Sequence, residues 1–162
     1  MREVVIYGDS VLETKAGPVT QFDPELELLC ADMFEAMKHD HGIGLAAPQV
    51  GVSSRVFVTD VEGDRKRVFV NPEIIMTSTE QVEYEEGCLS FPGLYFMVKR
   101  PTAVKIQALD ERGKVFTLEA DGLLARVILH ENDHLDGKLF IDRISPFKRE
   151  RALKHYERLI KM

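Results

Sequence analysis

Residues 127–137 read Val-Ile-Leu-His-Glu-Asn-Asp-His-Leu-Asp-Gly, and the rest of this 162-residue chain is organised around them. The stretch contains His-Glu-x-x-His in an apolar setting. If it is helical, His130 and His134 lie on one face of the helix, one turn apart. Two imidazoles so placed can hold one transition metal, and Glu131 is left beside the metal as a proton acceptor.

The surrounding residues predict that this helix is buried. Asp121 is the expected N-cap, Gly122 follows it, and Gly137 is the expected stop. Apolar residues recur at helical spacings on more than one side: Leu123, Leu124, Val127, Ile128 and Leu135. A motif this short also matches by chance, and the alternative is an ordinary helix with its polar side in water. The apolar flanks favour the metal site, because buried ionisable groups must be paired or coordinated.

Length, charge and cysteine usage limit the class of protein. A chain of 162 residues is enough for one domain, taken here as residues 1–162. The net charge of −6 disfavours binding to DNA or to a membrane surface, and no apolar run is long enough to span a bilayer. The N-terminus lacks a secretory signal pattern. With only two cysteines, Cys30 and Cys88, a reducing, cytoplasmic setting is expected.

The N-terminal third predicts one helix followed by a glycine-rich loop. Asp23-Pro24-Glu25 is typical of a helix start, and a clean apolar stripe follows it until Gly42, where the helix is expected to end. Cys30 lies in this stripe and is interpreted as a core residue. The segment 42–51 carries three glycines and a proline, so no regular element is expected there. Its glycines permit close approach of a ligand to the backbone.

Strands are expected in the middle of the chain. They are predicted at residues 55–60, 67–71 (ended by Pro72), 80–86, 102–109 and 114–119, with a hairpin turn at 110–113. Ser145-Pro146 opens a last helix that runs to Met162. The fold class predicted is α+β: mainly antiparallel strands packed around a buried metal-binding helix, with N-terminal and C-terminal helices.

A third ligand is available between the strands. Cys88 lies in Glu85-Glu86-Gly87-Cys88-Leu89-Ser90-Phe91-Pro92-Gly93, among glycine-rich turns and outside any regular apolar pattern. A thiolate there can complete a Cys-His-His site and leave one coordination position open, as in catalytic metal sites. The alternative is a buried thiol, since the Cys-to-His separation is far longer than in zinc fingers.

Three motifs together resemble those of the peptide deformylase family: residues 42–49 (Gly-Ile-Gly-Leu-Ala-Ala-Pro-Gln), 86–90 (Glu-Gly-Cys-Leu-Ser) and 130–135 (His-Glu-Asn-Asp-His-Leu). They occur in the family's order, and the resemblance covers nearly the whole chain. It implies that Cys88, His130 and His134 are metal ligands and that Glu131 is the general base and acid. It also implies that Gln49 and the backbone N–H of Leu89 polarise the formyl oxygen. The substrate-binding residues implied are Ile43, Gly44, Tyr84, Glu86, Gly87, Leu123 and Val127, and Arg100 is expected to support the site by pairing with Glu86.

The activity implied by the resemblance is removal of the N-terminal formyl group from formyl-methionyl nascent polypeptides, with release of formate. One divalent metal ion is expected, Fe²⁺ first, with Ni²⁺, Co²⁺ or Zn²⁺ also accepted. Some family members dock on the ribosome through the last helix, which is basic here. Two departures stand out: Leu129 replaces the glutamine that usually precedes the His-Glu pair, and Tyr84 and Arg126 occupy pocket positions where smaller or apolar residues also occur.

Two other functions use the same helix. One is a different metallohydrolase, such as a peptidase of the His-Glu-x-x-His type, with a carboxylate as third ligand in place of Cys88. The other is a module in which the metal is only structural, with no open coordination position and no catalytic need for Glu131.

Overall fold

The computed structural model describes residues 2–162, and its elements follow the predicted α+β pattern. The α-helices are α1 (Pro24–His39), α2 (Gly122–Leu135) and α3 (Pro146–Ile160), with 3₁₀ turns η1 (Ser10–Glu13), η2 (Ala47–Val50) and η3 (Phe140–Arg143). The strands are β1 (Gly44–Ala46), β2 (Val56–Thr59), β3 (Arg67–Thr77), β4 (Gln81–Gly87), β5 (Tyr95–Pro101), β6 (Ala103–Leu109) and β7 (Val115–Asp121). None of these helices in residues 2–162 is long and apolar enough to cross a membrane.

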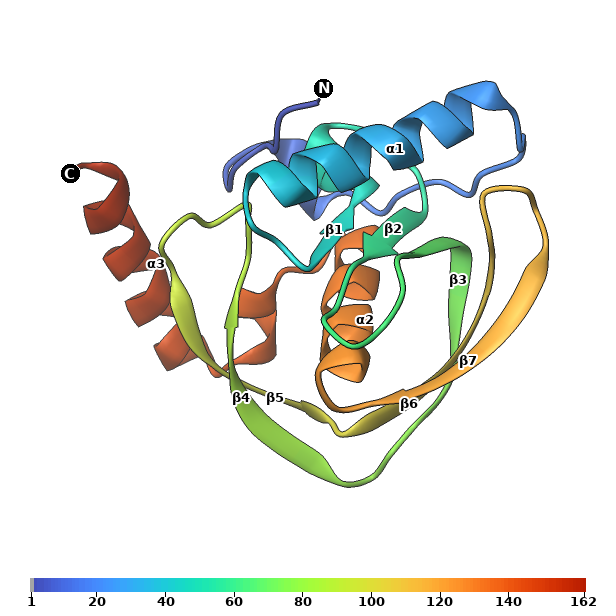
Figure 1. Ribbon diagram of the computed structural model, residues 1–162. Coiled ribbons are helices and arrows are strands. Elements are labelled where there is room, and N and C mark those ends of the chain that lie inside the picture. The colour runs from blue at the N-terminus through green and yellow to red at the C-terminus, as the bar shows by residue number, and fades with distance from the viewer. Residues whose placement is uncertain (1) are drawn as a thin grey trace.

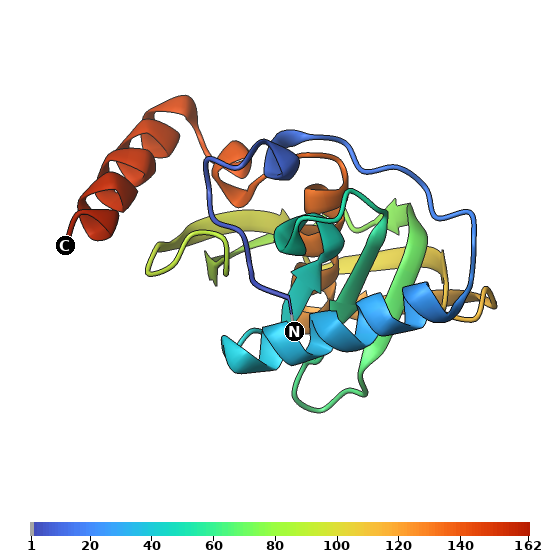
Figure 2. The ribbon, with the colours of Figure 1, turned by 90° about the horizontal axis from the view of Figure 1, so that it is seen from above.

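The strands form two antiparallel sheets around α2. In the described part of the chain, one sheet has the order β1-β2-β3-β6-β7 and the other consists of β4 and β5 alone. Figure 1 shows α2 in the middle of the molecule, with β6 and β7 curving beneath it and β4–β5 between α2 and α3. Seen from above, α1 lies across the β1–β3 end of the larger sheet, and α3 projects to one side (Figure 2). The predicted enclosure of the metal-motif helix by antiparallel strands is confirmed.

The helices pack through separate apolar clusters. The stripe of α1, including Met33 and Met37, packs on β1 and β2. The apolar side of α2, including Ile128, packs on Phe57 and Phe69 of the larger sheet. Tyr156 of α3 joins Phe140 and Phe91, a residue of the β4–β5 loop, in a third cluster. Helix α2 and the β4–β5 loop therefore pack in different clusters.

The end of α1 differs from the prediction. The helix ends at His39, and His41 rather than Gly42 takes the left-handed conformation, with φ 59°. The N–H of Gly42 donates to the carbonyl of Met37 at 2.8 Å and closes the helix end. Gly42 has a different reason to be glycine, because a Cβ there would lie 2.7 Å from Cδ1 of Leu89.

Both ends of α2 lie where they were predicted, although the cap is not the expected one. Asp121 occupies the N-cap position, but its side chain makes no capping hydrogen bond. The chain enters the helix directly from β7. At this end of the helix the N–H of Gly122 donates to the carbonyl of Thr102. At the other end Gly137 is left-handed with φ 72°, as the stop signal predicted.

Several predicted element boundaries were wrong, and some strands were not predicted. The segment expected to lack regular structure contains β1 and η2. Strand β3 continues through Pro72 to Thr77, because the register with β6 is interrupted between Val70 and Glu73 and Pro72 loses no ladder bond there. Strand β5 was not predicted, and it pairs with β4 along its whole length. Helix α3 ends at Ile160, short of Met162.

Replacing Gly137 by alanine should lower the free energy of unfolding by more than the cost of holding an alanine in the left-handed conformation. The residue is left-handed, and its Cβ would lie 2.9 Å from the backbone carbonyl of Glu13, which ties η1 to the end of α2. Left-handed backbone costs roughly 1–2 kcal/mol and the clash should add about 1–3 kcal/mol. Gly63→Ala is the control, because Gly63 has φ 86° with open space around it. Equal urea midpoints for the two variants would contradict the proposed packing role.

Candidate functional site

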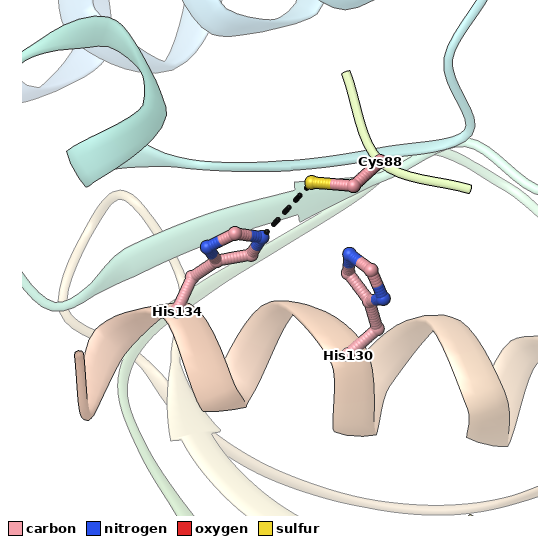
Figure 3. A group of neighbouring side chains, drawn as sticks. All are labelled: Cys88, His130 and His134. Atoms are coloured by element: carbon pink, nitrogen blue, oxygen red, sulfur yellow. Dashed lines mark hydrogen bonds between the residues drawn. The ribbon is translucent and has the colours of Figure 1, made fainter. Parts of the chain in front are cut away.

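The three sulfur and nitrogen donors predicted from the sequence meet at one point. His130 and His134 project from the same face of α2, and Cys88 reaches them from the loop after β4 (Figure 3). Their donor atoms all lie within 4.8 Å of one another, and Sγ of Cys88 is 3.5 Å from Nε2 of His134. Within residues 2–162 no other group of His, Cys, Asp or Glu has this geometry.

The donor set fits a transition metal. Nδ1 of His130 lies 2.8 Å from the Glu86 carboxylate, and since a carboxylate only accepts, this nitrogen carries the proton. The other ring nitrogen points toward Cys88 (Figure 3), and once it has released its proton its lone pair can ligate a metal. A thiolate with two imidazoles suits iron, cobalt, nickel or zinc, and three protein ligands are typical of catalytic sites with an open position.

Electrostatics at the donors favour added positive charge. Burial would lower the pKa of His130, but its neighbours Cys88 and Glu86 outweigh burial and raise that pKa to about 10. Burial and the adjacent His130 lower the pKa of His134 well below its usual value. His134 is therefore neutral, which is the form of the imidazole that binds metals. The position between the three donors favours a positive charge, as a metal ion there would supply.

Glu131 lies beside the donors without a polar partner of its own. Its side chain is buried, and its Oε1 has no hydrogen-bond partner among the described residues. Burial, opposed only in part by His130 and Arg100, raises the pKa of Glu131 to about 7. Gly44 makes the room for it, because a Cβ on Gly44 would lie 2.7 Å from Oε2 of Glu131. A carboxyl group with a pKa near neutrality can both take and return a proton.

Gln49 is held rigidly opposite the donors. Its Oε1 accepts from the N–H of Ala46 at 3.0 Å, which fixes the orientation of the amide. Nε2 then donates toward Ser90 Oγ at 3.2 Å and toward Cys88 Sγ at 3.5 Å. Leu89 follows Cys88 directly, and its side chain rests against Gly42. The amide of Gln49 and the chain around Leu89 thus face the same space as the metal donors.

These residues line a cleft of about 760 Å³. The structure brings almost the whole predicted set to its walls: Ile43, Gly44, Gln49, Tyr84, Glu86, Gly87, Cys88, Leu89, Leu123, Val127, His130 and Glu131. His134 lies deeper, with an exposed fraction of 1%, and Arg100 lies behind Glu86. The cleft is mixed, with an apolar side formed by Ile43, Leu123 and Val127 next to the polar donors.

A buried ion cluster supports the cleft from behind. Arg100 donates to Glu86 through Nε at 2.5 Å and Nη2 at 3.0 Å, and its Nη1 donates to Asp133 at 3.0 Å, so the predicted Arg100–Glu86 pair is present. Burial would raise the pKa of Glu86, but hydrogen bonds from His130 and Arg100 outweigh it and hold that pKa at about 2. Glu86 therefore stays ionised and fixes the ring of His130.

The sequence reasoning missed three members of this site: Ser90, Asp133 and the polar role of Arg126. Asp133 accepts from Arg100 and from Arg143, and Arg126 bonds Glu86 from α2. The available signal was the presence of Arg126 and Asp133 in a helix predicted to be buried, because such charges require partners. The carboxylates and guanidinium groups that pair with Arg126 and Asp133 are set by the tertiary fold.

Glu86→Gln should destabilise the metal-free protein by about 3–5 kcal/mol at pH 7, because it leaves Arg126 buried without a matching charge and Arg100 with Asp133 as its only carboxylate partner. The pH dependence should change too. The folded-state pKa of about 2 lies below the unfolded value of about 4.3, so the stabilisation is present above pH 4.3 and is lost as pH falls toward 2.

Urea unfolding at pH 7 and at pH 3 measures both effects. Glu85→Gln is the matched control, because Glu85 is exposed on the same strand. The acid-dependent loss should persist in the control and shrink in Glu86→Gln. A Glu86→Gln protein as stable as the control would mean that the cluster contributes nothing to the fold.

Comparison with known proteins places the chain among close relatives. A family model described as polypeptide deformylase matches residues 1–150. The peptide deformylase of Treponema pallidum (strain Nichols) is 50% identical over 157 residues, 97% of this chain and 96% of the relative. That of Cellvibrio japonicus is also 50% identical, over 96% and 93%. The solved peptide deformylase structure from Legionella pneumophila superposes with a TM-score of 0.93 at 43% identity, covering 99% of this chain and 96% of that one.

Proposed function

The chain belongs to the polypeptide deformylase family, and on that premise we propose that this cleft hydrolyses N-formyl-methionyl polypeptides with the residues described above. The enzyme is metal-dependent and removes the formyl group from nascent peptides. The observation that carries the residue assignments is the convergence of Cys88, His130 and His134 within 4.8 Å, beside the buried carboxyl group of Glu131.

The metal ion would be held by Cys88, His130 and His134, and we propose Fe²⁺ as the ion. When bound, a divalent metal supplies Lewis acidity, which makes water more acidic and a carbonyl more electrophilic. A thiolate and two imidazoles suit ferrous iron and also accept nickel, cobalt or zinc. The place of action would be the cytoplasm, where formylated nascent chains arise.

Glu131 carries the proton in this mechanism. In the metal-free protein burial raises its pKa to about 7, and Glu131 would take a proton from the attacking water and return it to the amine nitrogen as the C–N bond breaks. The oxygen of water is added to the formyl carbon, so the products are formate and a free peptide N-terminus. The amide N–H of Gln49, fixed by its bond to Ala46, and the backbone N–H of Leu89 stabilise the oxyanion.

The methionine side chain would occupy the apolar side of the cleft. Ile43, Leu123 and Val127 supply aliphatic walls there, and Tyr84 adds its ring. The backbone of Gly44 and Gly87 lies beside this space and would contact the substrate chain, while the room left by their missing side chains is taken by Glu131 and by the ring of Tyr95. Such a pocket favours a flexible thioether over a charged side chain.

Glu131→Gln tests the mechanism. Glutamine keeps the size and hydrogen-bonding ability of the residue but cannot take a proton, so kcat for formate release from a formyl-methionyl peptide should fall by at least about 10²–10⁴-fold. Metal content should stay near that of the wild type, because Glu131 is not a ligand in this assignment. Formate assay and metal analysis on the same samples measure both.

The contrasting variant is Cys88→Ser, which should lose metal and activity together. Cys30→Ser is its control, because burial first and Glu111 and Glu27 next raise the pKa of Cys30 to about 12 and leave it a neutral core thiol on α1. Turnover retained in Glu131→Gln with full metal would assign the proton to another group. Full metal content in Cys88→Ser would remove Cys88 from the ligand set.

A second proposal concerns docking on the ribosome through α3. This helix is basic in an acidic chain, with cations at Lys148, Arg149, Arg151, Lys154, Arg158 and Lys161. Tyr156 anchors the helix, because it is buried against Phe91. Lys148, Arg151, Lys154 and Arg158 are exposed, whereas Arg149 is half-buried and pairs with Asp142, and the exposed cations suit RNA phosphates.

Neutralising α3 should weaken ribosome binding without affecting peptide turnover. The variant is Arg151→Gln/Lys154→Gln/Arg158→Gln, which keeps Tyr156 in its cluster and should reduce the slope of log K against log salt by about 2–3. The control removes the same charge from exposed cations elsewhere: Arg65→Gln/Arg112→Gln/Lys114→Gln. Co-sedimentation with ribosomes that is equal for both variants would end the proposal.

A further inference from the structure

The metal donors come from two parts of the fold that share no sheet. His130 and His134 lie on α2, whereas Cys88 follows β4. Within the described residues, β4 pairs only with β5, and neither strand is hydrogen-bonded into the larger sheet. The position of Cys88 relative to the histidines therefore depends on what joins β4 and β5 to α2.

Arg126 makes that junction directly through the backbone. Its Nη2 donates to the carbonyl of Val82 on β4 at 2.7 Å, and Nη1 donates to the carbonyl of Val98 on β5 at 2.9 Å. Nη1 also donates to Oε2 of Glu86, at 2.5 Å. The side chain of Arg126 thus bonds both strands, and it bonds β4 a second time at Glu86, two residues before Cys88.

The place of Arg126 on its helix links the strands to the ligands. It lies one helical turn before His130, so the two side chains share a face of α2. Arg126 is buried, with an exposed fraction of 6%, and the ring of Tyr84 packs over its guanidinium at 5.6 Å. Burial of a guanidinium is costly unless its donors are used, so the observed bonds are needed to keep it there.

Other contacts between these parts are of a different kind. Arg100 of β5 bonds Asp133 of α2 at 3.0 Å, but this bond joins two side chains, each of which can move without shifting a strand. Bonds to main-chain carbonyls fix the strand itself. The planar guanidinium reaches two carbonyls and a carboxylate at once, which the single nitrogen of lysine cannot do.

We propose that Arg126 is a positioning residue of the metal centre, which sets the distance between Cys88 and the histidine pair by tying β4 and β5 to α2. The inference rests on the metal site of the proposed function. It assigns to Arg126 a role different from that of a pocket wall, and it gives this position a reason to be arginine rather than an apolar residue.

The test uses Co²⁺ as the metal, because a cobalt–thiolate bond gives a charge-transfer absorption that reports directly on Cys88. Arg126→Met keeps much of the volume and loses every bond, and Arg126→Lys keeps the charge and loses the bridge. Both should bind Co²⁺ about 10–100-fold more weakly in competition with a chelator, with a weakened or shifted thiolate band. Lysine should not restore the wild-type values.

Arg55→Met is the matched control. Arg55 is also a largely buried arginine tied to the end of α2, through the carbonyl of Leu135 at 2.8 Å and the carboxylate of Asp136 at 2.9 Å, but none of its side-chain hydrogen bonds reaches β4 or β5. Its loss should lower the urea midpoint and leave cobalt affinity and the thiolate band unchanged. This separates positioning from general loosening of α2.

The outcomes are distinct. Wild-type cobalt affinity and spectrum in Arg126→Met would overturn the inference, as would an equal loss of affinity in Arg55→Met. Full recovery by Arg126→Lys would show that charge alone suffices and that the bridge to two strands is unimportant. A cobalt–thiolate band that survives in Cys88→Ser, with Arg126 intact, would instead remove Cys88 from the proposed ligand set, which is a separate failure.

Discussion

The ionised carboxylate of Glu86 is the group on which the arrangement of the site depends. It is buried, with an exposed fraction of 5%, and it accepts hydrogen bonds from Arg100, Arg126 and His130. A buried charge is tolerated only when it is paired and hydrogen-bonded on most sides. Meeting this requirement brings together β4, β5 and α2; α2 carries both histidines, and Cys88 follows β4 directly.

Two neighbouring carboxyl groups in this cleft have opposite environments, and the difference suits opposite roles. Glu86 is surrounded by donors, which hold its pKa at about 2, whereas burial of Glu131 without a hydrogen-bond partner raises its pKa to about 7. The first is a permanent anion that orients His130. The second changes protonation near neutral pH, as a proton carrier must. The absence of a side chain at Gly44 allows Glu131 to stay in this partner-free position.

The parts of the fold that were predictable carry local signals. Helix α1 has a capping aspartate and an apolar stripe, α2 has its left-handed Gly137, and the hairpin between β6 and β7 has its turn residues. Strand β5 was missed because its burial alternates but the polarity of its sequence does not: the buried side includes Arg100, and the exposed side includes Tyr95 and Met97. Strand β1 is three residues long and exists through its pairing with β2, which no local pattern encodes.

The site shows the same division between local and tertiary information. Spacing on one helix predicts that His130 and His134 face the same side, but nothing local joins them to Cys88, and family resemblance supplied that ligand. The departure at Leu129 lies away from the donor face of α2. Leu129 is half-buried against the apolar cluster of the larger sheet, on a different face from the donors. An apolar side chain there leaves no buried polar group unpaired, whereas the face of Arg126, His130 and His134 is constrained by every bond that places the metal donors.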